Sequence, residues 1–162
     1  MLKLRKNKKG FTLVELIVVI AIMAVLAGTV AGVTVSQLNK QTDTANKNQA
    51  KKIADTIYTE LIENSAITSD DMIKELKAAY GSIIKTGAQN DTATKGKEFT
   101  VTYTAEVKDT TDTTKVTAYA YYTVEYKGKQ SGGKGDESYF ISAENGVQTT
   151  AAAASTIPAA GD

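Results

Sequence analysis

The sequence predicts an α+β fold, in which a long N-terminal α-helix, hydrophobic in its first half, packs by its second half against a small antiparallel β-sheet. Residues 16–35 are uncharged, and beyond residue 49 the apolar residues recur every three or four positions, as on one face of a helix. From residue 98 apolar and polar residues alternate instead, which is typical of strands. The 162 residues have room for one small domain.

The composition excludes several kinds of chemistry. The chain has no cysteine and no histidine, which removes disulfides, thiol nucleophiles, the usual zinc ligands and imidazole bases. No convergent acid pair replaces them, so we expect no enzyme, no cofactor and no metal site. Outside the first ten residues, 14 basic residues stand against 18 acidic ones. This mildly acidic body has no broad attraction for phosphate backbones, so nucleic acid is not an expected partner.

The apolar block can span a membrane. Leu16 to Val35 is a run of 20 residues whose clear polar interruptions are Thr29 and Thr34, and this length matches the hydrocarbon core of a bilayer. Five cationic residues precede the run, so the positive-inside rule keeps the N-terminus in the cytoplasm. Everything after about residue 36 is then expected outside the cytoplasmic membrane.

Two simpler interpretations of this block are an ordinary secretory signal peptide and a plain single-pass anchor. The apolar part of a signal peptide is roughly 7 to 15 residues long, whereas this block is longer and continues into a helical pattern. Against a plain anchor stands Glu15, since an ionisable residue in a membrane segment is costly and is by default paired and functional.

Glu15 has no partner within the segment, and Lys9 is the nearest cation, on the far side of Gly10. If a peptidase cuts between Gly10 and Phe11, a new α-amino group appears four residues before Glu15. Its reference pKa is about 8, so it would be cationic at neutral pH. The cut would therefore create the missing partner.

Residues 8–27, KKGFTLVELIVVIAIMAVLA, resemble the class III signal of type IV prepilins. The resemblance implies that a membrane-embedded prepilin peptidase cleaves after Gly10 and that the exposed Phe11 is N-methylated. It further implies that Glu15 pairs with the terminal amine of a neighbouring subunit during assembly. A subunit out of register would leave this carboxylate unpaired in apolar surroundings, which costs several kcal/mol.

The resemblance also implies the partners and the organisation of the chain. Residues 1–10 would be a leader peptide, residues 11–35 a transmembrane and filament-core helix, and residues 36–162 an extracellular head with a flexible C-terminal tail. The partners would be further copies in a helical filament, the peptidase, and an assembly platform with an ATPase-driven motor. The chain would reside in the cytoplasmic membrane before assembly and in an extracellular pilus afterwards, in a bacterial or archaeal-type system, of which the bacterial one is favoured.

Gly28 and Gly32 stand near the place where many family members carry a proline. Each glycine costs a helix about 1 kcal/mol relative to alanine, so the pair predicts a local weakening of the helix. With Ala24 they also form a stripe of small residues along which helices can approach closely. The alternative is that small residues are simply common in transmembrane helices.

The first helix is expected to run from Phe11 to about Asn64, with its polar stretch 36–49 facing solvent or neighbours. A second helix, capped by Ser69 or Asp70, would end at Gly81. Residues 98–107 and 115–126 are predicted to form an antiparallel hairpin, followed by a third strand at 138–142. On the first run, the apolar residues at positions 99, 101, 103, 105 and 107 would face the helix. On the second run, every other residue from 116 to 126 would do the same, and Tyr119 and Tyr121 would point outward.

The remaining segments give weaker signals. Residues 128–135, GKQSGGKG, approach a phosphate-binding pattern but lack its hydroxyl residue, so we interpret them as a flexible connection. In related pilins a disulfide closes this region, which here must be closed by hydrogen bonds and packing. Asp109 and Asp112 are interpreted as turn formers and not metal ligands. Asn145-Gly146 suggests a type I′ turn, Asn90-Asp91-Thr92 is a glycosylation sequon, and residues 151–162 are expected to be loose.

Three functions remain open. A major pilin would form a filament for adhesion, surface motility or aggregation. A pseudopilin of a type II secretion or DNA-uptake system shares the whole N-terminal logic, although Glu15 favours a subunit that stacks below another. A non-polymerising anchored surface protein would keep the Gly10-Phe11 bond intact.

Overall fold

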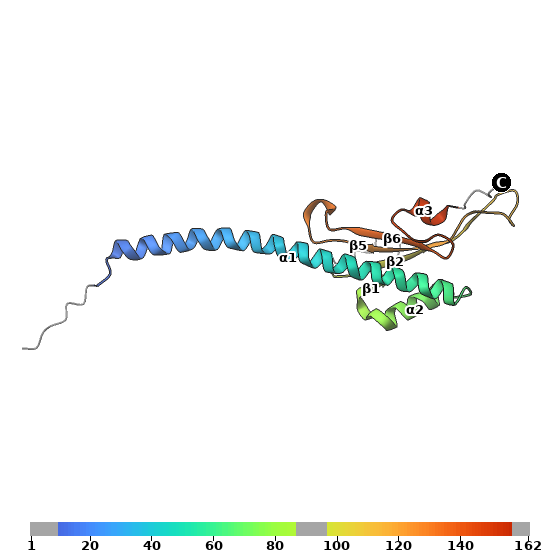
Figure 1. Cartoon of the computed structure of the whole chain (residues 1–162), viewed down its shortest axis with the longest axis horizontal. Coiled ribbons are helices and arrows are strands. Elements are labelled where there is room, and N and C mark those ends of the chain that lie inside the picture. The colour runs from blue at the N-terminus through green and yellow to red at the C-terminus, as the bar shows by residue number, and fades with distance from the viewer. Residues whose placement is uncertain (1–9, 87–96, 157–162) are drawn as a thin grey trace, which may run out of the picture. The chain divides into compact units, whose positions relative to one another are not determined.

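The computed structural model describes residues 10–86 and 97–156 (Figure 1). The chain divides into two compact units, residues 1–38 and residues 39–162. Helix α1 (Leu13–Glu63) begins in the first unit and ends in the second, so the predicted long helix is confirmed to within two residues at each end. An α+β layout, with this helix followed by a small sheet, is likewise confirmed.

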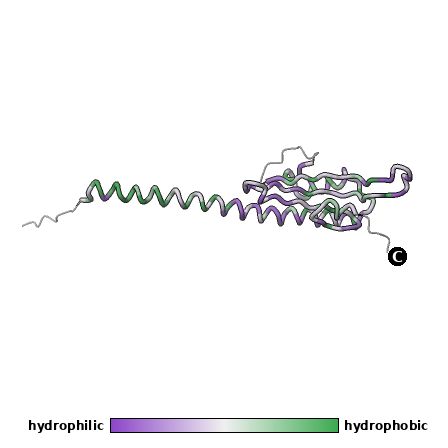
Figure 2. The backbone as a smooth tube through the Cα atoms, turned by 90° about the horizontal axis from the view of Figure 1, so that it is seen from above, coloured by the Kyte–Doolittle hydropathy of each residue, from purple (hydrophilic) through white to green (hydrophobic). Residues whose placement is uncertain are grey.

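The first unit consists of the apolar part of α1. Figure 2 shows this part of the helix coloured as hydrophobic, in contrast to the largely hydrophilic second unit. The large apolar side chains from Phe11 to Val35 are exposed, with fractions between 47% at Val19 and 92% at Phe11. Among the described residues no core covers these apolar side chains, which occupy every turn of the helix, so the segment suits an apolar surrounding.

The second half of α1 buries one face against the rest of the second unit. Ala50, Ile53, Ala54 and Ile57 are fully buried, as their spacing of three and four residues predicts. The core that they enter is shared by helix α2 and the sheet, and it contains Met72, Leu76, Ile84, Phe99, Val101, Tyr122, Val124, Tyr126 and Ile141. One expectation for α1 is wrong: Asp43, in the polar stretch assigned to solvent, is only 1% exposed.

Helix α2 (Ser69–Tyr80) buries Met72 and Leu76. Its N-cap is Thr68, one residue earlier than predicted, because the Thr68 side chain accepts a hydrogen bond from the backbone N–H of Asp71. The helix ends at Gly81 as predicted, with a φ of 69° and its N–H bonded to the carbonyl of Lys77. A 3₁₀ turn, η1 (Gly81–Ile83), follows.

The main sheet has five strands in the order β1-β2-β5-β6-β7. Their bounds are β1 (Ile84–Thr86), β2 (Phe99–Thr104), β5 (Tyr121–Tyr126), β6 (Glu137–Ser142) and β7 (Gly146–Gln148). The predicted hairpin is confirmed in its central part, where Phe99 pairs with Tyr126 and Thr104 with Tyr121. Strand β1 was not predicted, and it is the one parallel neighbour in a sheet that is otherwise antiparallel.

Both predicted hairpin runs break before they reach the turn. Their outer parts form a separate two-stranded ribbon, β3 (Val107–Lys108) and β4 (Val116–Ala118). Val107 in this ribbon and Tyr103 near the end of β2, both expected to face the helix, are 54% and 45% exposed. The reason is geometric: α1 ends at Glu63, and the ribbon continues past the part of the sheet that the helix covers.

The C-terminal region is more ordered than expected. Residues 151–155 form helix α3 (Ala151–Ser155) and not a loose tail, with Ala154 buried. Asn145 holds this helix, because its side-chain amide donates to the carbonyls of Ala154 at 2.8 Å and Thr156 at 2.7 Å. The type I′ turn is wrong: Gly146 has a φ of 69°, but no non-glycine residue in the described part of the chain has a positive φ.

Several predictions fall on residues outside the described ranges. They concern the leader before Gly10, the sequon at Asn90, most of the connection between β1 and β2, and residues 157–162.

Candidate functional site

The predicted cleavage junction lies just before α1. Gly10 and Phe11 are exposed and non-helical, and the helix begins at Leu13. Phe11 is 92% exposed, and a methyl group on the Gly10 Cα would meet no atom within 4 Å. A peptidase needs an accessible bond outside regular structure, and the Gly10-Phe11 bond meets that requirement.

Thr12 and Glu15 form a capping box at the start of α1. The carbonyl of Thr12 accepts the backbone N–H of Leu16 at 3.3 Å, and its hydroxyl oxygen accepts the N–H of Glu15 at 3.2 Å. In return, Glu15 Oε2 accepts the backbone N–H of Thr12 at 2.8 Å and the Thr12 hydroxyl at 2.8 Å. Two backbone donors of the first turn are thereby satisfied reciprocally, which fixes where the helix begins.

The capping box corrects the expectation that Glu15 has no partner within its own segment. The hydrogen bonds from the Thr12 backbone N–H and the Thr12 hydroxyl both end on Glu15 Oε2, and among the described residues none ends on Oε1. Sequence reasoning missed this pairing, although the signal is present as Thr12-x-x-Glu15 directly before an apolar run. The carboxylate is thus held at the helix start, one turn from Phe11. Cleavage after Gly10, methylation of Phe11 and pairing of Glu15 with a neighbour's amine stay predictions.

The helix behind this box is suited to an apolar environment. It is long and apolar enough to cross a membrane, and none of its most apolar window is buried within the chain. The two hydroxyl side chains of its apolar stretch 16–35 bond to their own helix: Thr29 donates to the carbonyl of Leu26 at 3.0 Å and Thr34 to that of Val30 at 2.8 Å. Neither therefore needs an outside partner, which lowers the cost of placing them in lipid or in a helical bundle.

Gly28 and Gly32 lie within continuous α-helix, so the single chain has no break at the predicted weak point. A methyl group at either position would meet no atom within 4 Å. The small-residue stripe is thus an open surface, and its use for helix packing is an expectation that the single chain does not test.

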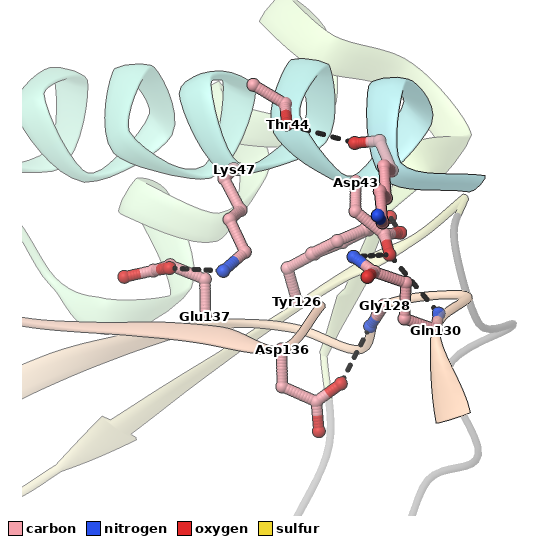
Figure 3. Close-up of polar contacts among 9 residues, drawn as sticks. Asp43, Thr44, Lys47, Tyr126, Gly128, Gln130, Asp136 and Glu137 are labelled. Carbon is pink, nitrogen blue, oxygen red and sulfur yellow. Dashed lines mark hydrogen bonds and ion pairs between the residues drawn. The ribbon is translucent and has the colours of Figure 1, made fainter. Parts of the chain in front are cut away.

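A second constellation of polar residues joins α1 to the connection between β5 and β6 (Figure 3). Asp43 Oδ1 accepts the Tyr126 hydroxyl at 2.9 Å and the backbone N–H of Lys129 at 2.8 Å. Its Oδ2 accepts the backbone N–H of Gln130 at 3.2 Å and the Gln130 side-chain amide at 3.0 Å. Four donors from one short segment therefore converge on a single buried carboxylate, and we name this arrangement the Asp43 clamp.

The clamp keeps Asp43 ionised. Burial alone raises the pKa of Asp43, but the hydrogen bonds from Lys129, Gln130 and Tyr126 outweigh it and hold the pKa below the usual value. Burial is also the main cause that raises the pKa of Tyr126 to about 12, with Asp43 adding to it, so the phenol stays a donor at any physiological pH. Asn46 completes the group, donating to the Tyr126 oxygen at 3.0 Å.

Two glycines let the connection approach α1. A Cβ on Gly135 would collide with Asp43 Oδ2, and a Cβ on Gly128 would collide with the backbone of Gly135. Both residues are buried. Asp136 secures the far side by accepting the N–H of Gly128 at 2.8 Å. The GKQSGGKG run is therefore held against the helix and is not a flexible connection, and a 3₁₀ turn, η2 (Ser131–Gly133), lies within it.

The clamp explains why this run resembles a phosphate-binding loop without being one. Its backbone amides do bind an anion, but the anion is the carboxylate of Asp43 from the same chain. The same contacts close a region that was expected to be closed by hydrogen bonds and packing in the absence of cysteine. Sequence reasoning missed Asp43, although it lies seven residues before Ala50 and so on the buried face of α1.

Asp109 and Asp112 form turns, as predicted. Asp109 Oδ1 accepts the backbone N–H groups of Thr111 at 2.8 Å and Asp112 at 3.3 Å, and Asp112 Oδ1 accepts that of Thr114 at 3.0 Å. Within the described ranges no group of three or more acidic side chains could hold a metal ion.

Comparison with protein families adds one finding. Residues 5–31 match the family described as the prokaryotic N-terminal methylation motif. The match includes Gly10, Phe11, Glu15 and Gly28, and it ends one residue before Gly32. The comparison with curated proteins found no match, and neither did the comparison with solved structures.

Proposed function

We propose that this chain, which carries the class III signal of type IV pilins and pseudopilins, is the structural subunit of an extracellular type IV pilus. The precursor is cleaved after Gly10 by prepilin peptidase, N-methylated at Phe11, and polymerised by an assembly platform and its ATPase motor. Its apolar helices form the filament core, and its second units lie outside. The filament serves adhesion, surface motility or aggregation.

The observation that carries the proposal is the coincidence of three features at residues 5–31. The methylation motif matches there, an accessible Gly10-Phe11 bond lies directly before α1, and Glu15 is fixed at the helix start by Thr12. A plain membrane anchor requires only the apolar residues. The capping box accounts for a carboxylate at this position in any helix, so the feature that a plain anchor does not require is the methylation motif around the Gly10-Phe11 bond.

The precursor is inserted in the cytoplasmic membrane through α1 before assembly. The apolar window of α1 fits this location in length and composition. During assembly the helix exchanges lipid for the helices of neighbouring copies, and the small residues at Ala24, Gly28 and Gly32 support close packing there.

Mass spectrometry of surface-sheared material tests the proposal. We expect filaments whose subunit begins at N-methylated Phe11. Its N-terminal peptide should be heavier than the unmethylated peptide by one CH₂ group, about 14 Da. A full-length chain that stays in the membrane, with the Gly10-Phe11 bond intact and no surface filament, would contradict it and support an anchored surface protein.

A further inference from the structure

At the two opposite ends of the second unit, charges of opposite sign gather that have no ion pair among the described residues, whereas Lys52 and Lys77 lie between the ends. We define the loop end as the end where α1 carries Asp43 and β5 turns toward β6. We define the turn end as the end where α1 stops at Glu63 and α2 begins. The helix between Asp43 and Glu60 separates them by about 25 Å at 1.5 Å per residue.

The loop end presents cations. Lys129 and Lys134 are exposed on the clamped connection, and neither has an ion pair among the described residues. Lys40 lies on α1 one turn before Asp43, and Lys97 precedes Phe99, which pairs with Tyr126. The acids beside these lysines are already engaged: Asp43 is buried in the clamp, and Glu137 pairs with Lys47 at 3.1 Å. Lys127 pairs with Glu125 at 2.6 Å and with Asp136 at 3.8 Å.

The turn end presents anions. Within the described residues, its acids without an ion pair come from the end of α1, from α2, from the β6–β7 turn and from the β3–β4 ribbon; they are Glu60, Glu63, Asp70, Glu75, Glu144, Asp109 and Asp112. Among the described cations at this end, Lys115 is the one without an ion pair, since Lys74 pairs with Asp71 and Lys108 with Glu106. The Gly146 position near the Tyr58 ring places the β6–β7 turn at this end.

The acids at the turn end repel one another. The negative charge of Glu75 is the main cause that raises the pKa of Glu60 above its usual value, and Glu63 adds to it. Carboxylates that face each other without a cation destabilise the isolated subunit. A cation supplied from outside the subunit would remove that destabilisation.

We propose that the loop end of one copy docks on the turn end of a neighbouring copy, with Lys129 and Lys134 placed against Glu60 and Glu75. The inference rests on the proposed function, because it describes a contact between subunits of one filament. The two surfaces are different and lie at opposite ends, so the contact is head-to-tail. Such a contact does not close into a two-fold dimer and generates an open helical assembly instead.

The Asp43 clamp gives this contact a fixed shape. The backbone N–H of Lys129 is bound to Asp43, and Gln130 is bound by both its backbone and its side chain. A cationic loop that is held before docking loses less conformational entropy on docking than a free one. The clamp is therefore a positioning device for the lysines that flank it.

Zero-length carbodiimide crosslinking of native sheared filaments tests the contact without any variant. This reagent joins a lysine to a carboxylate only where the two are in contact. Within one copy the two ends are about 25 Å apart, so an amide between Lys129 or Lys134 and Glu60, Glu63 or Glu75 must join two copies. We expect such peptides in a dimer band. Intact filaments that yield none of them overturn the inference.

Charge reversal provides the second test. Lys129→Glu with Lys134→Glu, or Glu60→Lys with Glu75→Lys, should each lower the yield of filaments about fivefold or more, the factor expected from a pair or two per contact. Combining all four reversals should restore the yield. Lys52→Glu with Lys77→Glu makes the same change in net charge on exposed residues of the middle of the unit, and it should have no effect.

The outcomes separate this inference from the proposed function. Filaments that begin at N-methylated Phe11, lack the crosslinks and ignore the charge reversals leave the filament subunit in place and overturn the docking contact. The same pattern is expected if the lysines bind an anionic lipid surface instead of a copy. Absence of any filament overturns both.

Discussion

The Tyr126 hydroxyl donates a 2.9 Å hydrogen bond to Asp43 Oδ1 across a sequence separation of 83 residues. This bond connects the middle of α1 to the end of β5. It fixes the position from which the next four residues of the chain fold against the helix. Because the chain has no cysteine, this hydrogen bond, and not a disulfide, joins the two segments. Its loss should therefore affect more than one side chain.

Asp43→Ala should destabilise the second unit by about 2–4 kcal/mol, because it leaves the donors of Tyr126, Lys129 and Gln130 without their acceptor. Asp55→Ala, on the same helix, removes an exposed pair with Lys51 and should cost no more than about 1 kcal/mol. Urea unfolding of the full chain in detergent, followed by tyrosine fluorescence, measures both. Equal midpoints for the two variants would mean that the clamp is not a stabilising element.

Gly135→Ala should be poorly tolerated, because its Cβ would collide with Asp43 Oδ2 and the carboxylate cannot move without breaking its bonds. We expect a loss of about 1–3 kcal/mol. Gly132→Ala is the matched control: its φ of 71° is unfavourable for alanine, but nothing occupies the space around it. The cost of Gly132→Ala should stay near the backbone penalty of about 1–2 kcal/mol. Combining Asp43→Ala with each glycine variant should relieve the strain in Gly135→Ala but not the strain in Gly132→Ala.

The clamp should also give the second unit an acid-sensitive component of stability. The pKa of Asp43 in the folded chain lies below its ordinary value of 3.8, so the folded state binds fewer protons than the unfolded state near that pH. The contribution is full above that value and is lost as the pH falls through the folded pKa. Asp43→Asn removes this component while exposed acids keep theirs. The difference in unfolding free energy between the two proteins should therefore shrink as the pH falls below about 4, and a constant difference would contradict this.

Asn145→Asp should release helix α3, since a carboxylate in place of the amide would face the carbonyls of Ala154 and Thr156 without a proton to donate. Two hydrogen bonds at about 0.5–1.5 kcal/mol each imply that the equilibrium constant for local opening of α3 rises roughly tenfold or more. Hydrogen exchange at Ala153 and Ala154 measures it, because both amides bond to Thr150. Asn48→Asp, on an exposed position of α1, should leave those amides unchanged.

Thr12→Val should loosen the first turn of α1, because valine can neither accept from the Glu15 amide nor donate to its carboxylate. A lost N-cap costs about 1 kcal/mol, and Thr12→Ser should retain it. Amide exchange at Glu15 in detergent micelles distinguishes the two variants, because this amide donates to the Thr12 hydroxyl oxygen. If valine protects this amide as well as serine does, the capping box does not set the helix start.

Much of the fold could be predicted because its signals are local. The bounds of α1 and α2 follow from periodicity and from residues such as Gly81, and the pairing of Phe99 with Tyr126 follows from alternation. The errors arise where distant segments meet. The burial of Asp43 depends on a loop more than 80 residues later, and the exposure of Val107 depends on where α1 stops.

The candidate site likewise contains some residues that a local sequence pattern identifies and others that it does not. Gly10, Phe11 and Glu15 are contiguous enough for a motif to identify them, and the match at residues 5–31 agrees with that identification. The bond between Thr12 and Glu15 was within reach of sequence reasoning, since a capping box is a local pattern. The clamp was not, because no spacing rule connects a helix aspartate to a glycine-rich turn between two strands.

The role of Glu15 in assembly is the central claim, and the surface yield of a Glu15→Ala variant tests it most directly. Cells that express Glu15→Ala should process the chain to begin at N-methylated Phe11 and retain it in the membrane, while the sheared fraction contains little or none of it. Asp55→Ala, which removes an exposed acid of α1 outside the proposed docking contact, serves as the control and should still reach the surface. Normal filaments from Glu15→Ala would contradict the claim that this carboxylate sets the register of assembly.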